Sequence, residues 1–187
     1  PAWCGVATGG LGLNDKQPLV MDTFLQGVDP AWHAMFRELA AHAVTLGYTP
    51  SKTKTSDMCL DFRNARLGRT LMKLEQHEQK HDGYRYKERA MPGLRLRFHA
   101  AASDEPIFRS GIRRVIEEFD GKYTGCYGCG ACKGELRGYI YVYEDGRRVF
   151  RCGREMISLF DFLPAHTEEI KRLMTAQQAM DAADRVN

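Results

Sequence analysis

Three of the chain's six cysteines are evenly spaced in the stretch CYGCGACKG, as Cys126, Cys129 and Cys132. Shortly afterwards the sequence GYIYVYEDGRRVFRCG contains two alternating runs joined by Asp145-Gly146, which is a strong signal for a β-hairpin. With Asp145 and Gly146 as the two turn residues, Tyr139 pairs with Cys152. The hairpin then returns Cys152 to the end where the other cysteines stand, so four thiolates are expected to converge on one point.

Four cysteine sulfurs around one point are typical of a tetrahedral structural zinc site. Glycines at 130 and 153 follow Cys129 and Cys152, where they allow the backbone amides to turn toward the sulfurs. Because protein ligands fill all four positions, the zinc is expected to stabilise folding without activating water or substrate. The sequence therefore predicts a zinc-ribbon-like hairpin at 123–154 whose metal ligands are Cys126, Cys129, Cys132 and Cys152.

The same cysteines also suit sites other than a four-cysteine zinc centre. The run Cys126 to Cys132, read as Cys-x-x-Cys-Gly-x-Cys, resembles over seven residues the first part of the cluster motif of bacterial ferredoxins. That family has a fourth cysteine and a proline where this chain has Leu136 and Arg137. The resemblance implies a redox or electron-transfer protein holding an iron–sulfur cluster of the 4Fe-4S type, with Cys152 completing its ligands. The cysteines also admit a zinc site that uses two of the three with His99, a redox thiol pair, or no metal at all.

Three segments outside the cysteine hairpin have apolar residues at helical spacing. Asp29 and Pro30 suit the start of a helix that continues to about Leu46, and Gly47 suits its end. Apolar residues recur at helical spacing from about 105 to 119, and again from about 167 to 183 after Pro164. These three segments are the predicted main helices.

Alternating apolar residues predict strands near residues 58, 70 and 95, with a further strand through 156–162. The segments 58–63 and 69–75 are joined by five residues that suit a hairpin connection. In the run from Leu94 to His99 the leucines are expected to face inward, and Arg95, Arg97 and His99 outward. Together with Tyr139 and Tyr141 on the cysteine hairpin, where Tyr141 is expected opposite Phe150, these residues form the candidate ligand-binding set.

The composition limits the partners, the cellular location and the classes of enzyme that the chain suits. The 187 residues carry a formal net charge of +3, with basic residues concentrated between 50 and 154, which suits an anionic partner. No apolar run reaches the roughly 18 residues of a membrane span, so a cytoplasmic protein with reduced thiols and no membrane partner is expected. Nucleotide-binding and hydrolase motifs are absent from the sequence.

These observations predict a single α+β domain over residues 21–187, after a flexible leader at 1–20, with an antiparallel sheet, three main helices and a metal-stapled β-hairpin. The expected function is that of a non-enzymatic, cytoplasmic zinc-binding domain that binds an anionic ligand, a protein or a nucleic acid. The alternative function is that of an iron–sulfur redox protein.

Overall fold

The computed structural model of the chain describes residues 16–53, 58–76, 91–97, 132, 138–153, 156–159 and 162–183. Within these residues the helices are α1 (Lys16–Leu25), α2 (His33–Thr45) and α4 (Thr167–Ala183). A five-stranded antiparallel sheet has the order β1 (Thr49–Lys52), β2 (Cys59–Asn64), β3 (Arg69–Glu75), β4 (Gly93–Arg97) and β7 (Met156–Leu159). A separate hairpin consists of β5 (Gly138–Val142) and β6 (Arg148–Cys152). The predicted α+β class with an antiparallel sheet is confirmed.

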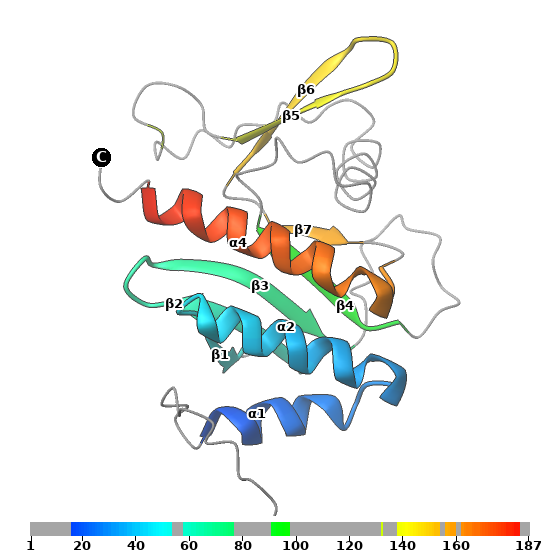
Figure 1. Cartoon of the computed structure of the whole chain (residues 1–187), viewed down its shortest axis with the longest axis vertical. Helices are drawn as coiled ribbons and strands as arrows, with labels where there is room; N and C mark the ends of the chain where they lie inside the picture. Colours follow the sequence, from blue (N-terminus) through cyan, green and yellow to red (C-terminus); the bar gives the residue numbers. More distant parts are fainter. Residues whose placement is uncertain are drawn as a thin grey trace, which may run out of the picture.

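The strand register explains why one face of the sheet is covered by helices. Pairing places the apolar residues in two rows that run across β2, β3, β4 and β7. The rows are Leu60, Leu74, Leu94 and Leu159, and Phe62, Met72, Leu96 and Ile157. All eight side chains are buried in one core cluster with residues of α2 and α4. Figure 1 shows these two helices side by side across the sheet, with the β5–β6 hairpin projecting beyond α4.

The opposite face of the sheet is polar. Between the two apolar rows the register sets Asp61, Lys73, Arg95 and Ser158 opposite one another. The ammonium of Lys73 lies 3.2 Å from the carboxylate of Asp61, and both side chains are partly buried. Because side chains alternate between the faces of a sheet, this charged row is the direct counterpart of the apolar rows.

The helix α2 begins at His33, later than the start predicted at Asp29 and Pro30. Asp29 caps a 3-10 turn over Pro30–Trp32 by accepting a hydrogen bond of 2.9 Å from the amide of Ala31, and α2 continues directly from that turn. After the helix, Gly47 has a φ of 85°, a value that glycine adopts without strain. Asp29 therefore caps the 3-10 turn and not α2, whose own N-cap is Trp32, and only the predicted stop at Gly47 is confirmed.

The expected flexible leader at 1–20 is wrong for its last five residues, which belong to α1. Met21, Phe24, Leu25 and Val28 are buried, at the spacing of one helical face. The edge strand β1 was also not predicted, because Thr49–Lys52 has no apolar alternation. By contrast, β3 and α4 have the predicted bounds, whereas the helix expected at 105–119 lies outside the described residues.

The start of α4 is packed by an aromatic cluster. The ring of Phe162, which is 2% exposed, lies 5.0 Å from that of Trp32 and 6.2 Å from that of Phe36. Leu163, the next residue, is 52% exposed. Phe162 therefore joins the segment that leads into α4 to the residues that begin α2.

Replacing Phe162 by alanine should lower the free energy of unfolding by roughly 3–5 kcal/mol, because it leaves a cavity between two aromatic rings. The matched control, Leu163→Ala, should change it by no more than about 0.5 kcal/mol, since that side chain is largely in solvent. Urea denaturation followed by circular dichroism measures both. Equal effects of the two substitutions would show that Phe162 is not a packing anchor.

Candidate metal centre

Two of the four predicted metal ligands are described. Cys152 is the last residue of β6 and is 5% exposed, and Cys132 is partly buried. Cys126 and Cys129 lie outside the described residues. In the part of the chain that the structure describes, no three histidine, cysteine, aspartate or glutamate side chains gather in a group that could hold a metal ion. The predicted four-cysteine site thus remains a prediction.

The predicted register of the β5–β6 hairpin is wrong by one residue. Tyr141 pairs with Val149 and not with Phe150, and Cys152 pairs with Gly138 and not with Tyr139. The cause is the turn. Tyr143 and Arg147 close a three-residue loop, with a hydrogen bond of 2.9 Å from the Tyr143 amide to the Arg147 carbonyl.

Within this loop the amide of Gly146 donates to the carbonyl of Tyr143 over 2.9 Å, and Gly146 has a φ of 82°. A type I turn followed by a glycine with positive φ is the usual three-residue hairpin loop, whereas a two-residue type I′ turn needs positive φ at both central residues. Asp145 instead accepts a hydrogen bond of 2.9 Å from the Arg147 amide through its side chain. The Asp-Gly pair therefore predicted the hairpin correctly and its loop length incorrectly.

The corrected register still returns Cys152 to the base of the hairpin. Its partner, Gly138, begins β5 and follows Cys132 by six positions in the sequence. Gly138 has no side chain, so its cross-strand position places no side-chain atoms beside Cys152. The buried thiol of Cys152 therefore lies at the end of the hairpin that connects to the cysteine-rich segment.

Arg97, predicted to face solvent, is instead buried, and this expectation is wrong. Its side chain is 5% exposed, and its guanidinium lies 2.8 Å from the carboxylate of Asp181, whose side chain is 0% exposed. The Arg97 Nε donates a second hydrogen bond, of 3.1 Å, to the carbonyl of Gly153. Asp181 also accepts hydrogen bonds from Gln177 Nε2 at 3.0 Å and from the Tyr48 hydroxyl at 3.3 Å.

This buried network changes the acidity of Tyr48. Burial is the larger cause and the neighbouring charge of Asp181 the next, and together they raise the pKa of the Tyr48 phenol well above its ordinary range. Tyr48 is therefore a neutral hydrogen-bond donor at physiological pH. Its proton helps to satisfy the Asp181 carboxylate, which has left water entirely.

Arg95, the second arginine of the predicted ligand-binding set, is also engaged. Its Nε lies 3.3 Å from the carboxylate of Glu75, whose side chain is 3% exposed. Gly93 stands opposite Glu75, and a Cβ at Gly93 would come within 2.6 Å of the Glu75 Oε2. A larger residue at 93 would therefore force the Glu75 side chain that pairs with Arg95 to shift.

The other predicted ligand-binding residues do not form one described surface. Tyr141 is 7% exposed and its ring makes an edge contact with that of Tyr143 at a centroid distance of 4.8 Å, so Tyr141 contributes to the core. Tyr139 lies in β5 opposite Arg151, and His99 is outside the described residues.

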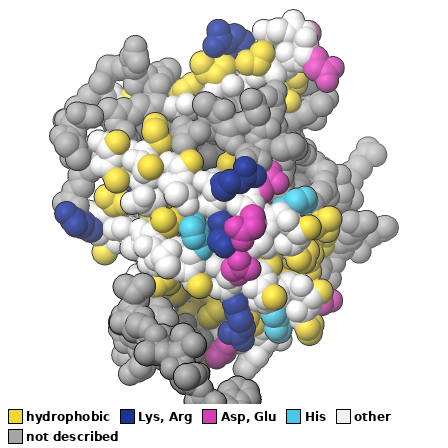
Figure 2. Space-filling model, viewed as in Figure 1, with side chains coloured by type: hydrophobic (Ala, Val, Ile, Leu, Met, Phe, Trp, Pro, Cys, Tyr) yellow, Lys and Arg dark blue, Asp and Glu magenta, His cyan; other side chains and the backbone are white. Residues whose placement is uncertain are grey.

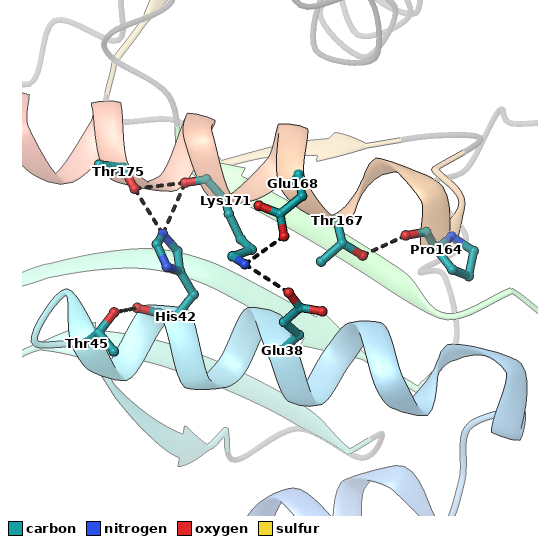
Figure 3. Close-up of polar contacts among 8 residues, drawn as sticks. All are labelled: Glu38, His42, Thr45, Pro164, Thr167, Glu168, Lys171 and Thr175. Atoms are coloured by element: carbon teal, nitrogen blue, oxygen red, sulfur yellow. Dashed lines mark hydrogen bonds and ion pairs between the residues drawn. The ribbon is translucent and has the colours of Figure 1, made fainter. Parts of the chain in front are cut away.

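A second polar cluster joins α2 to α4 at the surface (Figure 3). Lys171 Nζ lies 2.9 Å from the Glu38 carboxylate and 2.7 Å from that of Glu168. The hydrogen bonds with Glu168 and then Glu38 raise the pKa of Lys171, and the bond with Lys171 lowers the pKa of Glu168. His42 Nε2 lies 2.9 Å from the Thr175 hydroxyl oxygen and 3.2 Å from the Lys171 carbonyl oxygen.

Figure 2 shows these charged and histidine side chains as a band across the face formed by α2 and α4. The carboxylates of the band are exposed, with Glu38 at 51% and Glu168 at 75%. Exposed ion pairs of this kind contribute little to stability because water screens them. The band therefore orients two packed helices and does not resemble a reactive centre.

Sequence reasoning missed the partners of Arg97. Asp181 is 84 positions away in the chain, and Tyr48 precedes an edge strand that was not predicted. One signal was available, since Ile170, Met174, Gln177 and Asp181 recur at helical spacing on the buried side of α4. An acidic residue on the apolar face of a helix indicates that a buried basic partner exists elsewhere.

The comparisons with known proteins returned nothing: no family model matches the chain, and no curated protein or solved structure matches it either. Among the described helices, none combines the length and the apolar character that crossing a membrane requires.

Replacing Asp181 by alanine should lower the free energy of unfolding by about 3–5 kcal/mol, because it leaves the buried Arg97 guanidinium without its counter-ion. Replacing both partners, as Arg97→Met with Asp181→Leu, should restore much of that loss, since no buried charge then remains. Glu38→Gln, which breaks an exposed pair, should have a far smaller effect than Asp181→Ala. Chemical denaturation measures all three, and similar losses for Glu38→Gln and Asp181→Ala would contradict the argument.

Proposed function

We propose that this protein is a non-enzymatic zinc-binding domain in which Cys126, Cys129, Cys132 and Cys152 hold one structural zinc ion at the base of the β5–β6 hairpin. The observation that carries the proposal is the position of Cys152. It is buried, it ends β6, and its cross-strand neighbour is Gly138, where the chain arrives from the other three cysteines.

The chain connectivity supports a shared site. Because Gly138 follows Cys132 by six positions, Cys132 lies at most about 20 Å of extended chain away from the residue opposite Cys152. A thiolate is the form in which cysteine binds zinc, and binding releases its proton. A buried cysteine without a metal or a reactive neighbour is usually a small apolar residue, so the argument for Cys152 rests on the short stretch of chain between its cross-strand partner Gly138 and Cys132.

A site with four protein ligands has a structural role. It leaves no coordination position for water or substrate, so zinc contributes to folding and does not activate a reaction. The β5–β6 hairpin is a two-stranded sheet with exposed Ile140 and Val142, and isolated hairpins of this size are marginally stable in water. Zinc would add to the stabilisation that the hairpin gains from the core contacts of Tyr141. The proposal requires reduced thiols and is therefore consistent with the cytoplasmic location expected from the sequence.

The proposed partner is an anionic ligand, a protein or a nucleic acid. The β5–β6 hairpin is the proposed contact surface. Arg95 and Arg97 are engaged with Glu75 and Asp181, which weakens their case as direct ligand contacts. Arg147 and Arg148 are exposed beside the hairpin loop. The Arg147 guanidinium lies 4.0 Å from the centroid of the Tyr143 ring, which holds a cation at the hairpin surface.

Freshly purified protein should be colourless and contain one zinc per chain, and Cys152→Ser should lose the metal together with the order of the hairpin. The matched control is Cys59→Ser, because Cys59 is a buried cysteine of β2 whose sequence position lies far from the cysteine run. Elemental analysis and the visible spectrum measure the outcome. A brown preparation with iron and sulfide would favour the iron–sulfur alternative, and full zinc content in Cys152→Ser would refute the proposed ligand set.

Binding to an anionic polymer should be detectable at low salt and should fall steeply as salt rises, because cation release drives such binding. Single-stranded DNA of mixed sequence is a suitable probe. The double variant Arg147→Gln/Arg148→Gln should bind more weakly and with a smaller salt dependence than the parent protein. Lys52→Gln, which removes one exposed cation from β1, is the control. Absence of binding at low salt would exclude nucleic acid as the partner, and equal weakening by Lys52→Gln would exclude the hairpin as the contact.

A further inference from the structure

We infer that Arg97 is a positioning residue for the zinc ligand Cys152, which it holds in place through the peptide of Gly153. The inference rests on the proposed zinc site and adds to it the part of the core that orients one ligand. Its basis is the hydrogen bond of 3.1 Å from Arg97 Nε to the carbonyl of Gly153, the residue directly after Cys152.

The Arg97 guanidinium is well placed to fix a backbone position. It makes a second, charge-assisted contact of 2.8 Å with the Asp181 carboxylate, and both side chains are almost completely buried. A planar guanidinium that donates in two directions at once cannot rotate without breaking one of its bonds. The carbonyl of Gly153 is therefore held at a fixed place relative to β4 and α4.

Asp181 is itself held from two further directions. Gln177, one helical turn earlier on α4, donates to its Oδ1 over 3.0 Å, and the Tyr48 hydroxyl donates to its Oδ2 over 3.3 Å. The network thus joins the end of β4, the last turns of α4 and the residue before β1. All these side chains are buried, so the network is rigid and shielded from water.

A glycine after a metal-binding cysteine has a particular importance for the site. The hydrogen bond from Arg97 fixes the course of the chain directly after Cys152, and Gly153 is itself buried. Groups that hold the ligands of a metal in place contribute to affinity even though they do not touch the metal, and replacing them typically costs 10–100-fold in metal affinity. Arg97 acts on Cys152 in this indirect way.

The coupling between zinc binding at Cys152 and the Arg97–Asp181 pair must be reciprocal. If Arg97 and Asp181 favour the zinc-binding position of Cys152, then zinc at Cys152 must favour the packed position of the end of α4. Zinc binding is then expected to stabilise the last turns of α4, around Gln177 and Asp181, as well as the hairpin.

The test compares Arg97→Lys with the parent protein and with Phe162→Leu. Lysine keeps the positive charge beside Asp181 but has no second donor in a fixed direction for the Gly153 carbonyl. Phe162→Leu loosens the packing just before α4 and leaves the Arg97–Asp181 and Arg97–Gly153 contacts intact. Zinc affinity is measured by competition with a chromophoric chelator, and ligand geometry by the visible spectrum of the cobalt-substituted protein.

Arg97→Lys should bind zinc roughly 10–100-fold more weakly and should have an altered cobalt spectrum, whereas Phe162→Leu should retain the parent affinity and spectrum. Equal affinities for Arg97→Lys and the parent protein would overturn the inference while leaving the zinc site in place. Equal weakening by both variants would also overturn it, because the effect would then reflect general stability. If the parent protein binds no zinc, the proposed function fails and the inference fails with it.

A second measurement covers the case in which Arg97→Lys does not fold. Hydrogen exchange of the parent protein is followed with zinc present and after removal of zinc by a chelator. Removal should increase exchange in the last turns of α4 and leave the middle of α2 unchanged. Unchanged exchange at the end of α4, in a protein that has lost its zinc, would overturn the inference.

Discussion

The ion pair between Arg97 and Asp181 is the contact on which the arrangement of distant segments depends. Both groups have left water, and the cost of removing two charges from water is several kcal/mol for each. The structure offsets this cost with hydrogen bonds from Gln177 and Tyr48 to the carboxylate and from the guanidinium to the Gly153 carbonyl. Buried ion pairs can often be replaced by apolar pairs with little loss of stability, but an apolar pair does not specify which backbone groups must meet. The pair therefore contributes more to a unique arrangement than to net stability.

The helix α4 is fixed at both ends by chemically different contacts. At its beginning, the Phe162 ring packs against Trp32 and Phe36, and Lys171 bridges to Glu38 of α2. At its end, Asp181 is bound to Arg97. Between these points, Ile170 and Met174 pack on the apolar rows of the sheet. Apolar burial thus supplies the driving force for docking α4, and the polar contacts at the two ends set its position along the sheet.

Much of the fold was predictable because local signals agreed with the tertiary structure. The end of α2 follows from Gly47, and Asp29 and Pro30 predict the 3-10 turn that leads into the helix. The helix α1 was missed although Met21, Phe24 and Leu25 have helical spacing, because the glycine-rich residues before them suggested a leader that extended too far. The buried state of Arg97 was not predictable from alternation alone. Alternation assigns Arg97 to the same face as Arg95, opposite the leucines, but it does not reveal a contact with Asp181, which is 84 positions away on α4.

The candidate metal site, too, could be predicted from the sequence only in part. That Cys152 returns toward the cysteine run followed from the hairpin signal, and this holds in either register. The cross-strand partner of Cys152 depends on the length of the hairpin loop. That length is in turn set by whether one or two loop residues adopt positive φ. In this loop the glycine with positive φ is Gly146. The contact between Arg97 and Gly153 depends on residues 56 positions apart, which no local pattern in the sequence could relate.

The edge strand β1 has a consequence for how the protein behaves among copies of itself. An open sheet edge offers unpaired backbone groups to any other strand, and such edges lead to aggregation unless they are blocked. Here the second residue of the edge strand is Pro50, which has no amide hydrogen to donate, and Lys52 adds an exposed charge. The neighbouring strands also carry a register shift at Phe62 and Arg63, which distorts the ladder near this edge. The sheet is therefore protected on this side against extension by a strand of a second molecule. Pro50 and Lys52 form no part of the core, yet they make the protein more resistant to strand-mediated association at high concentration.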